Sequence, residues 1–111
     1  MPAFVFVRTI NAANISFDPA KDAANLAKHG VSLAEAANLT WDRLLCRPDA
    51  RRDDRELREV GFAPLADRVY CVVFVQKGRS FRIISLRRAN AREVVDYDQA
   101  LDEVRLHHPH A

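Results

Sequence analysis

The chain has few of the residues on which common cofactor and disulfide sites depend. It has 3 glycines among 111 residues, and none forms the glycine-rich loop that binds nucleotide phosphates. Its two cysteines, Cys46 and Cys71, do not form a CxxC pair, and each lies in an apolar segment. We therefore expect both thiols to be reduced and buried, in a protein of the reducing cytoplasm.

Long hydrophobic runs and metal-binding motifs are also absent. The longest apolar run near the N-terminus, Phe4 to Val7, is too short to cross a membrane or to form the core of a signal peptide. His107, His108 and His110 could offer imidazoles to zinc or nickel, but a frayed C-terminal tail explains them more simply. We expect no metal, no cofactor and no membrane partner.

Positive and negative charges nearly balance in this chain, since the formal net charge is only +2. The basic residues are nevertheless concentrated in one segment near the C-terminus, which contains no acidic residue and leaves the remainder of the chain acidic on balance. The basic residues of this segment are Lys77, Arg79, Arg82, Arg87, Arg88 and Arg92. Any binding of nucleic acid should therefore depend on this segment rather than on total charge.

The first part of the chain is predicted to form two helices. Asp18 followed by Pro19 is typical of a helix start and Gly30 of a helix end, so the first helix should cover 19–29. The second should begin at Ser32, which forms a capping box with Glu35, and end near residue 39 or 41. In the first helix we expect one face to be buried and another to be polar. The expected buried face consists of Ala20, Ala24, Ala27 and Val31. The expected polar face consists of Lys21, Asn25, Lys28 and His29.

The remainder predicts consecutive strands and a last helix. Short β-like runs cover residues 43–47, 56–62, 68–75 and 80–88, with a hairpin turn at 76–79. Asn90 and Glu93 form a capping box before a helix whose apolar stripe is Val94, Tyr97, Leu101 and Val104. The expected fold class is α+β, with two N-terminal helices, an antiparallel sheet of about four strands and one C-terminal helix. Residues 15–106 should form one domain, with 1–14 as an arm or extra edge strand and 107–111 as a histidine-containing tail.

Arginines on the last strand are the first candidates for function. Arg82, Arg87 and Arg88 could present guanidinium groups to phosphates, with Lys21, Lys77, Arg79 and Arg92 as further contacts to RNA. The alternative is that these charges only keep a strand edge soluble. His29 could transfer a proton near neutral pH with help from Lys28, or the pair could simply complement the helix dipole.

Two residues of the last helix have both a structural and a chemical interpretation. Glu93 could act as a base or orient an arginine, although its spacing from Asn90 is that of a helix cap. Tyr97 could donate a proton or stack on a base, although it lies on the apolar stripe of the helix. Both interpretations are compatible if the helix borders the site.

Two blocks of sequence resemble the BrnT family of toxins, a RelE-like branch of bacterial type II toxin-antitoxin systems. The first contains Phe17-Asp18-Pro19-Ala20-Lys21 and Lys28-His29-Gly30-Val31-Ser32. The second runs from Arg82 to Ala89 and continues to Glu93 and Tyr97. The chain departs from the family pattern at Phe17, Leu33 and Leu86. Leu86 stands where a small residue is usual, and its side chain could narrow a cleft beside Arg87.

The resemblance implies a RelE-like fold and a toxin that inhibits translation by cutting RNA without a metal. The residues present supply a metal-free route, and the candidate catalytic residues are His29, Lys28, Arg82, Arg87, Glu93 and Tyr97. The resemblance also implies a BrnA-like antitoxin with a ribbon-helix-helix domain, in a heterotetramer with two toxin copies. The alternative is a non-catalytic module on the same fold that binds nucleic acid or protein.

Overall fold

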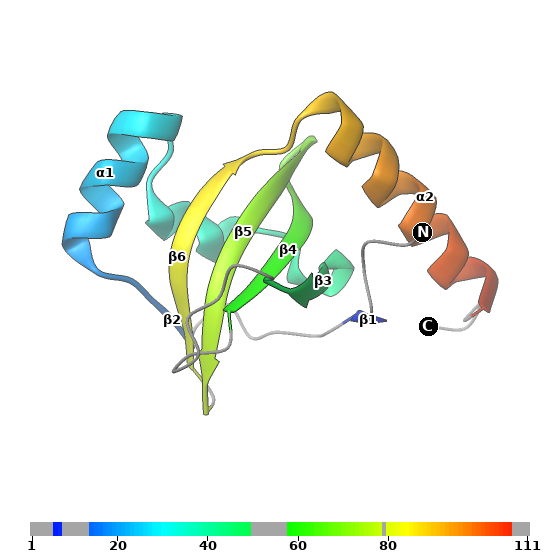
Figure 1. The fold of residues 1–111 in the computed structure, drawn as a ribbon, viewed down its shortest axis with the longest axis horizontal. Coiled ribbons are helices and arrows are strands. Elements are labelled where there is room, and N and C mark those ends of the chain that lie inside the picture. Colours follow the sequence, from blue (N-terminus) through cyan, green and yellow to red (C-terminus); the bar gives the residue numbers. More distant parts are fainter. Residues whose placement is uncertain (1–5, 8–13, 50–57, 79, 108–111) are drawn as a thin grey trace.

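A twisted sheet of six strands forms the centre of the molecule (Figure 1). The computed structural model describes residues 6–7, 14–49, 58–78 and 80–107. The strand order is β1-β3-β4-β5-β6-β2, and all neighbours are antiparallel except β2 and β6. The strands are β1 (Phe6–Val7), β2 (Ile15–Ser16), β3 (Leu45–Pro48), β4 (Arg58–Leu65), β5 (Arg68–Lys77) and β6 (Ser80–Arg88). The four predicted strands are confirmed, and a two-residue strand extends each edge.

Two α-helices flank the sheet. Helix α1 (Pro19–His29) begins at Asp18, whose carboxylate accepts a hydrogen bond from the Ala20 amide, and ends at Gly30 with φ +74°. Helix α2 (Ala91–His107) begins with the predicted capping box: the Glu93 amide donates to Asn90 Oδ1, and the Asn90 amide donates to Glu93 Oε1. The predicted starts of both helices are therefore confirmed.

The segment after α1 differs from the prediction of a second α-helix. It contains two 3₁₀ helices, η2 (Leu33–Asn38) and η3 (Trp41–Arg43). Ser32 caps η2 through the Ala34 amide, whereas the Glu35 carboxylate accepts from the Asn38 side chain. The capping box expected from Ser32 and Glu35 is therefore wrong at its second residue.

The predicted buried face of α1 is also wrong. Ala20, Ala24 and Ala27 are exposed, and Leu26 is 51% exposed, while Asn25 is the buried residue of the helix at 7%. The helix lies beside the open edge of β6, and its amide-bearing side faces that edge (Figure 1). Polar backbone groups along a strand edge require a polar partner, and this requirement outweighs the burial of small alanine side chains.

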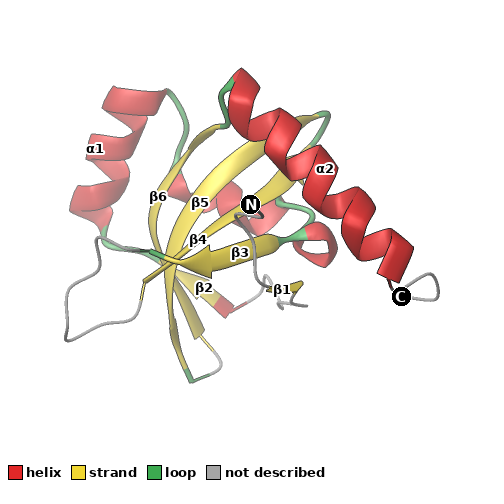
Figure 2. Ribbon diagram, turned by 45° about the vertical axis from the view of Figure 1, so that its right-hand side comes forward, coloured by secondary structure: helices red, strands yellow, loops and turns green. Residues whose placement is uncertain are grey.

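Two apolar clusters pack on the two faces of the sheet. One contains Trp41 from η3, residues of η2 and the inward side chains Phe74, Ile83 and Leu86. The other contains Leu45, Val60, Phe62, Cys71, Val73 and Tyr97, and α2 covers it (Figure 2). Side chains alternate between the faces along each strand. The end of the second face that α2 leaves uncovered is the surface on which the candidate site lies.

Candidate functional site

A β-bulge in β6 decides which arginines share a face of the sheet. Ser85 pairs with Val73 whereas Ile83 pairs with Phe74, so Ile84 is an extra residue in this strand. In a regular strand, residues five positions apart, such as Arg82 and Arg87, point to opposite faces. With the bulge, they pair with residues four apart on β5 and lie on the same face.

Arg88 is separated from these two arginines. It pairs with Tyr70, whose side chain packs against the opposite apolar cluster. Its side chain also lines another cavity, together with Asp67, Arg68 and Asp98. Arg82 and Arg87 are therefore the two predicted phosphate ligands of β6 that the structure places on one surface.

A cavity of about 330 Å³ lies on this face, next to the first turn of α2. Its apolar floor comes from Val60, Cys71 and Val73, and Ser85 lies beside them. Charged side chains surround the floor: Arg47, Asp49, Arg87 and Glu93. An open cavity with a dry floor and convergent charged groups is the usual form of a binding site for a small polar group.

Arg87 and Glu93 form a bidentate ion pair at one side of this cavity. Arg87 Nη1 donates to Glu93 Oε1 at 2.8 Å, and Nη2 donates to Oε2 at 2.9 Å. The hydrogen bond with Glu93 raises the pKa of Arg87 above its ordinary value. The hydrogen bond from Arg87, the Asn90 amide and the charges of Arg87 and Arg47 lower the pKa of Glu93, although burial opposes the shift. Both groups are therefore charged at neutral pH, and the guanidinium is fixed in one orientation.

His29 lies within electrostatic range of Arg87. Its pKa is lowered from the ordinary value by partial burial and by the positive charges of Lys28 and Arg87. An imidazole with a lowered pKa is mostly neutral at pH 7, so that one ring nitrogen is available to accept a proton. The end of α1 thus carries a proton acceptor within electrostatic range of a fixed cation, although His29 is not one of the described residues that line the cavity.

Asn25 joins these two elements. Its side-chain amide donates to the carbonyls of Leu86 and Val31 at 2.8 and 2.9 Å, and its Oδ1 accepts from the Leu86 amide at 3.1 Å. Asn25 therefore occupies the edge of β6 as a neighbouring strand would, one residue before Arg87. This contact attaches α1, which ends at His29, to β6 next to Arg87.

Leu86 does not narrow the cavity. It is 0% exposed and belongs to the apolar cluster on the opposite face of the sheet. Side chains alternate across a strand, so Leu86 points away from the face that carries Arg87. The expectation that this residue obstructs the site is wrong.

Tyr97 lies in the core rather than at the rim of the cavity. It is 2% exposed, and its hydroxyl donates to the Arg43 carbonyl at 2.7 Å. Through this bond, α2 is attached to the turn that precedes β3. The position of Tyr97 supports its structural interpretation.

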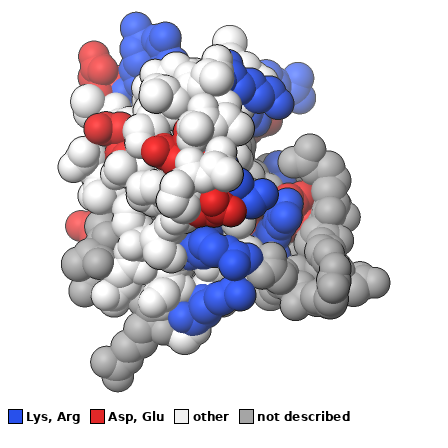
Figure 3. All heavy atoms as spheres, turned by 90° about the vertical axis from the view of Figure 1, so that its left-hand side faces the viewer, with Lys and Arg blue, Asp and Glu red and all other residues white. Residues whose placement is uncertain are grey.

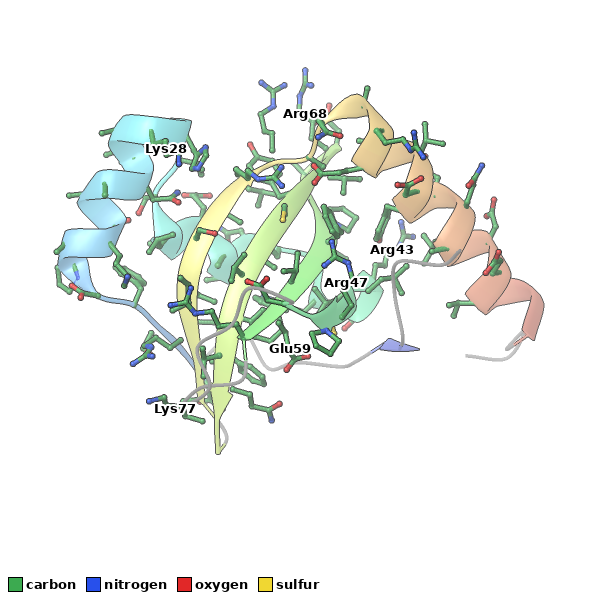
Figure 4. The ribbon with its side chains drawn as sticks, viewed as in Figure 1. Lys28, Arg43, Arg47, Glu59, Arg68 and Lys77 are labelled. Carbon is green, nitrogen blue, oxygen red and sulfur yellow. The ribbon has the colours of Figure 1, made fainter. Side chains whose placement is uncertain are left out.

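The remaining basic residues of the predicted segment lie apart from this cavity. Lys77 is at the tip of the β5–β6 hairpin, at the far end of the molecule from Lys28 (Figure 4). Arg92 is exposed on α2 and pairs with Asp96 at 3.4 Å. On the α1 side of the molecule, Lys and Arg form separate groups near the top and in the lower half (Figure 3). Arg79, His108 and His110 lie outside the described residues.

Two arginines of this face were missed from the sequence. Arg47 lines the cavity beside Glu93, and Arg58 lines a smaller cavity with Lys21 and Arg82. Arg58 starts an alternating run with Val60 and Phe62, and this period of two places all three on one face. That signal was present in the sequence, but the cross-strand register was needed to locate it beside Arg82.

Within the described ranges, no group of three or more His, Cys, Asp or Glu residues is arranged to hold a metal ion. No helix in this part of the chain has the length and apolar character required to span a membrane.

In a comparison with models of known protein families, one family matches this chain. The model of a family described as the ribonuclease toxin, BrnT, of type II toxin-antitoxin systems matches residues 17–93. This range covers α1, the four long strands and the start of α2, including both sides of the cavity. A search of curated proteins gives no match.

Proposed function

The chain belongs to the BrnT family of ribonuclease toxins of type II toxin-antitoxin systems, and we propose that it cuts single-stranded RNA at the Arg87 cavity without a metal ion. The observation that carries this proposal is the guanidinium of Arg87, which Glu93 fixes at the cavity, within electrostatic range of His29 at the end of α1. Together they provide a cation for a phosphate and a neutral acceptor for a proton.

The proposed reaction begins with the ribose 2′-hydroxyl, which is absent from DNA. His29 removes the proton from this hydroxyl, and the oxygen attacks the adjacent phosphorus. Arg87 stabilises the negative charge that develops on the phosphate oxygens. The bond from phosphorus to the 5′-oxygen breaks, leaving a 2′,3′-cyclic phosphate, and the departing oxygen takes a proton from Lys28 or from the protonated His29.

The positions of the other residues support different roles in this proposal. Glu93 orients Arg87 through the two hydrogen bonds and does not need to accept a proton. Arg47 contributes a second positive charge to the same cavity. Tyr97 acts through the packing of α2, because its hydroxyl is already bonded to a backbone carbonyl.

A second candidate function is RNA binding without cleavage. The observation in its favour is that Glu93 occupies two donors of Arg87, which leaves fewer of them for a transition-state oxygen. Arginine has five N–H donors, however. Besides the two bonds to Glu93, Nη1 donates to the Arg88 carbonyl at 3.2 Å, so Nε–H and one hydrogen of Nη2 remain for a phosphate oxygen. The two candidates differ in whether the RNA is cut.

Membership of a type II system implies an antitoxin partner. We propose that this partner is a BrnA-like protein with a ribbon-helix-helix domain, and that it covers the Arg87 cavity in a heterotetramer with two toxin copies. Free toxin would then inhibit translation by cutting RNA in the cytoplasm.

Inducible expression in a bacterium without the antitoxin tests this function. Wild-type protein should arrest growth, while Arg87→Ala and His29→Ala at equal protein levels should relieve the arrest. Arg43→Ala serves as a matched control, because Arg43 is exposed and is not one of the described residues that line the cavity. Normal growth with abundant wild-type protein would contradict the proposed toxin.

A further inference from the structure

A second, smaller basic cavity lies on the same face of the sheet. Its volume is about 140 Å³. Three basic side chains from three different elements line it, together with one acid and two isoleucines: Lys21 of α1, Arg58 of β4, Arg82 of β6, Asp18, Ile83 and Ile84. The proposed reaction at Arg87 does not use this cavity.

The register of the sheet places this cavity beside the first. Arg58 pairs with Val75, and Val75 pairs with Arg82, so the two arginines flank one valine across three strands. Their separation along this row is about 10 Å, which is twice the spacing between neighbouring strands. The next row along the same face contains Arg47 and Ser85, which line the larger cavity.

Arg58 has an unsatisfied donor at this position. Its Nε atom is buried and has no hydrogen-bond partner among the described residues. A buried donor without a partner destabilises the protein, and a bound phosphate oxygen would supply the missing acceptor. Among the described residues that line the cavity, the one acid is Asp18, which already accepts the Ala20 amide as the cap of α1.

We propose that Lys21, Arg58 and Arg82 form a second phosphate subsite, which binds the RNA backbone away from the phosphate that is cut. This inference rests on the proposed function and extends it. Arg82 and Arg87 are five residues apart on β6, which corresponds to roughly 15 Å of strand. A single phosphodiester cannot reach both sites, so the protein prefers single strands of several nucleotides over a dinucleotide.

Binding of uncleavable 2′-O-methyl RNA to the full chain tests the subsite independently of catalysis. Fluorescence anisotropy is measured with a strand of about ten nucleotides and with a dinucleotide. Arg58→Gln should weaken binding of the longer strand about tenfold and reduce the slope of log affinity against log salt by about one. It should leave dinucleotide binding unchanged, so that the preference for length decreases.

Two further variants make the result decisive. Lys21→Gln changes an exposed side chain of α1 and should show the same length-dependent loss, even if Arg58→Gln does not fold. Arg43→Gln removes an equal charge from an exposed residue that does not line the subsite, and it should have no effect. Equal affinities of Lys21→Gln, Arg43→Gln and wild type for the longer strand would overturn the subsite, as would a wild type that does not bind it. Failure of cleavage alone would contradict only the proposed reaction.

Discussion

Arg87 lowers the pKa of two ionisable neighbours, with opposite effects on their charge: it favours the charged form of one and the neutral form of the other. It lowers the pKa of Glu93, which stays charged and holds the guanidinium, and it lowers the pKa of His29, which stays neutral. Glu93 therefore fixes the orientation of Arg87, while burial, Lys28 and Arg87 together favour the neutral form of the proposed base. This coupling between three side chains is what distinguishes the cavity from a simple basic surface.

The first prediction concerns the His29 imidazole. Arg87→Gln removes a positive charge that disfavours the imidazolium, so the pKa of His29 should rise towards its ordinary value. NMR titration of the histidine ring protons measures this pKa directly.

In the wild type, the rate of RNA cleavage should fall on the acid side as His29 becomes protonated, at a pH below 6.5.

Arg68→Gln provides the control, because this residue is exposed and lines a different cavity. It should leave the His29 titration unchanged. A His29 pKa that is the same in Arg87→Gln and wild type would contradict the proposed proximity of these groups.

The second prediction concerns Glu93. Glu93→Gln loses the ion pair with Arg87 and weakens the cap of α2, and both groups are partly exposed, so the free energy of unfolding should fall by about 1 kcal/mol. The folded-state pKa of Glu93 lies below its ordinary value. The stabilising contribution is therefore complete above the unfolded-state pKa and is lost as pH falls through the folded-state pKa.

Urea denaturation at a series of pH values measures the difference between Glu93→Gln and wild type. The difference should be constant near neutrality and disappear in acid. A difference that persists unchanged at low pH would show that the carboxylate charge is not its cause.

At the scale of elements, α1 is attached to the sheet by an amide rather than by apolar packing. Asn25 satisfies both edge groups of Leu86, while the alanines of the helix face solvent. A free strand edge is a site for unwanted pairing with other chains, and the side chain closes it. The same contact attaches the helix that ends at His29 to the strand that carries Arg87.

The third prediction follows from this attachment. Asn25→Leu keeps a similar volume but leaves the Leu86 amide and carbonyl without partners, so it should reduce the free energy of unfolding by about 2–4 kcal/mol. Hydrogen exchange of the Leu86 amide should accelerate at the same time. Asn38→Ala, which removes one exposed hydrogen bond to Glu35, is the control and should cost much less. A small loss from Asn25→Leu, with slow exchange at Leu86, would contradict the structural role.

Local signals predicted the helix ends and the long strands, because these depend on neighbouring residues. Asp18, Gly30, Asn90 and Glu93 act within a few positions of the chain, and the structure confirms each. The bulge at Ile84 and the role of Asn25 depend on distant partners, and no local pattern contains that information. The sequence thus predicted Arg82, Arg87 and His29 as candidates but not the register that relates them.

At the scale of the whole molecule, the two faces of the sheet are covered by different elements. One face is closed by η2, η3 and the larger apolar cluster, and the other is covered by α2 at one end only (Figure 2). The uncovered part carries two cavities lined by arginines. The proposed RNA strand and the proposed antitoxin would therefore compete for the arginines that line these two cavities.

The most direct test of the account is the cleavage of a labelled single-stranded RNA by purified protein in the presence of a chelator. We predict fragments that end in a 2′,3′-cyclic phosphate, a loss of at least about 100-fold in rate for His29→Ala and for Arg87→Gln, and no cleavage where a 2′-deoxy nucleotide replaces the attacking ribose. Cleavage that stops when the chelator is added, or that continues at a 2′-deoxy position, would contradict a metal-free reaction at Arg87.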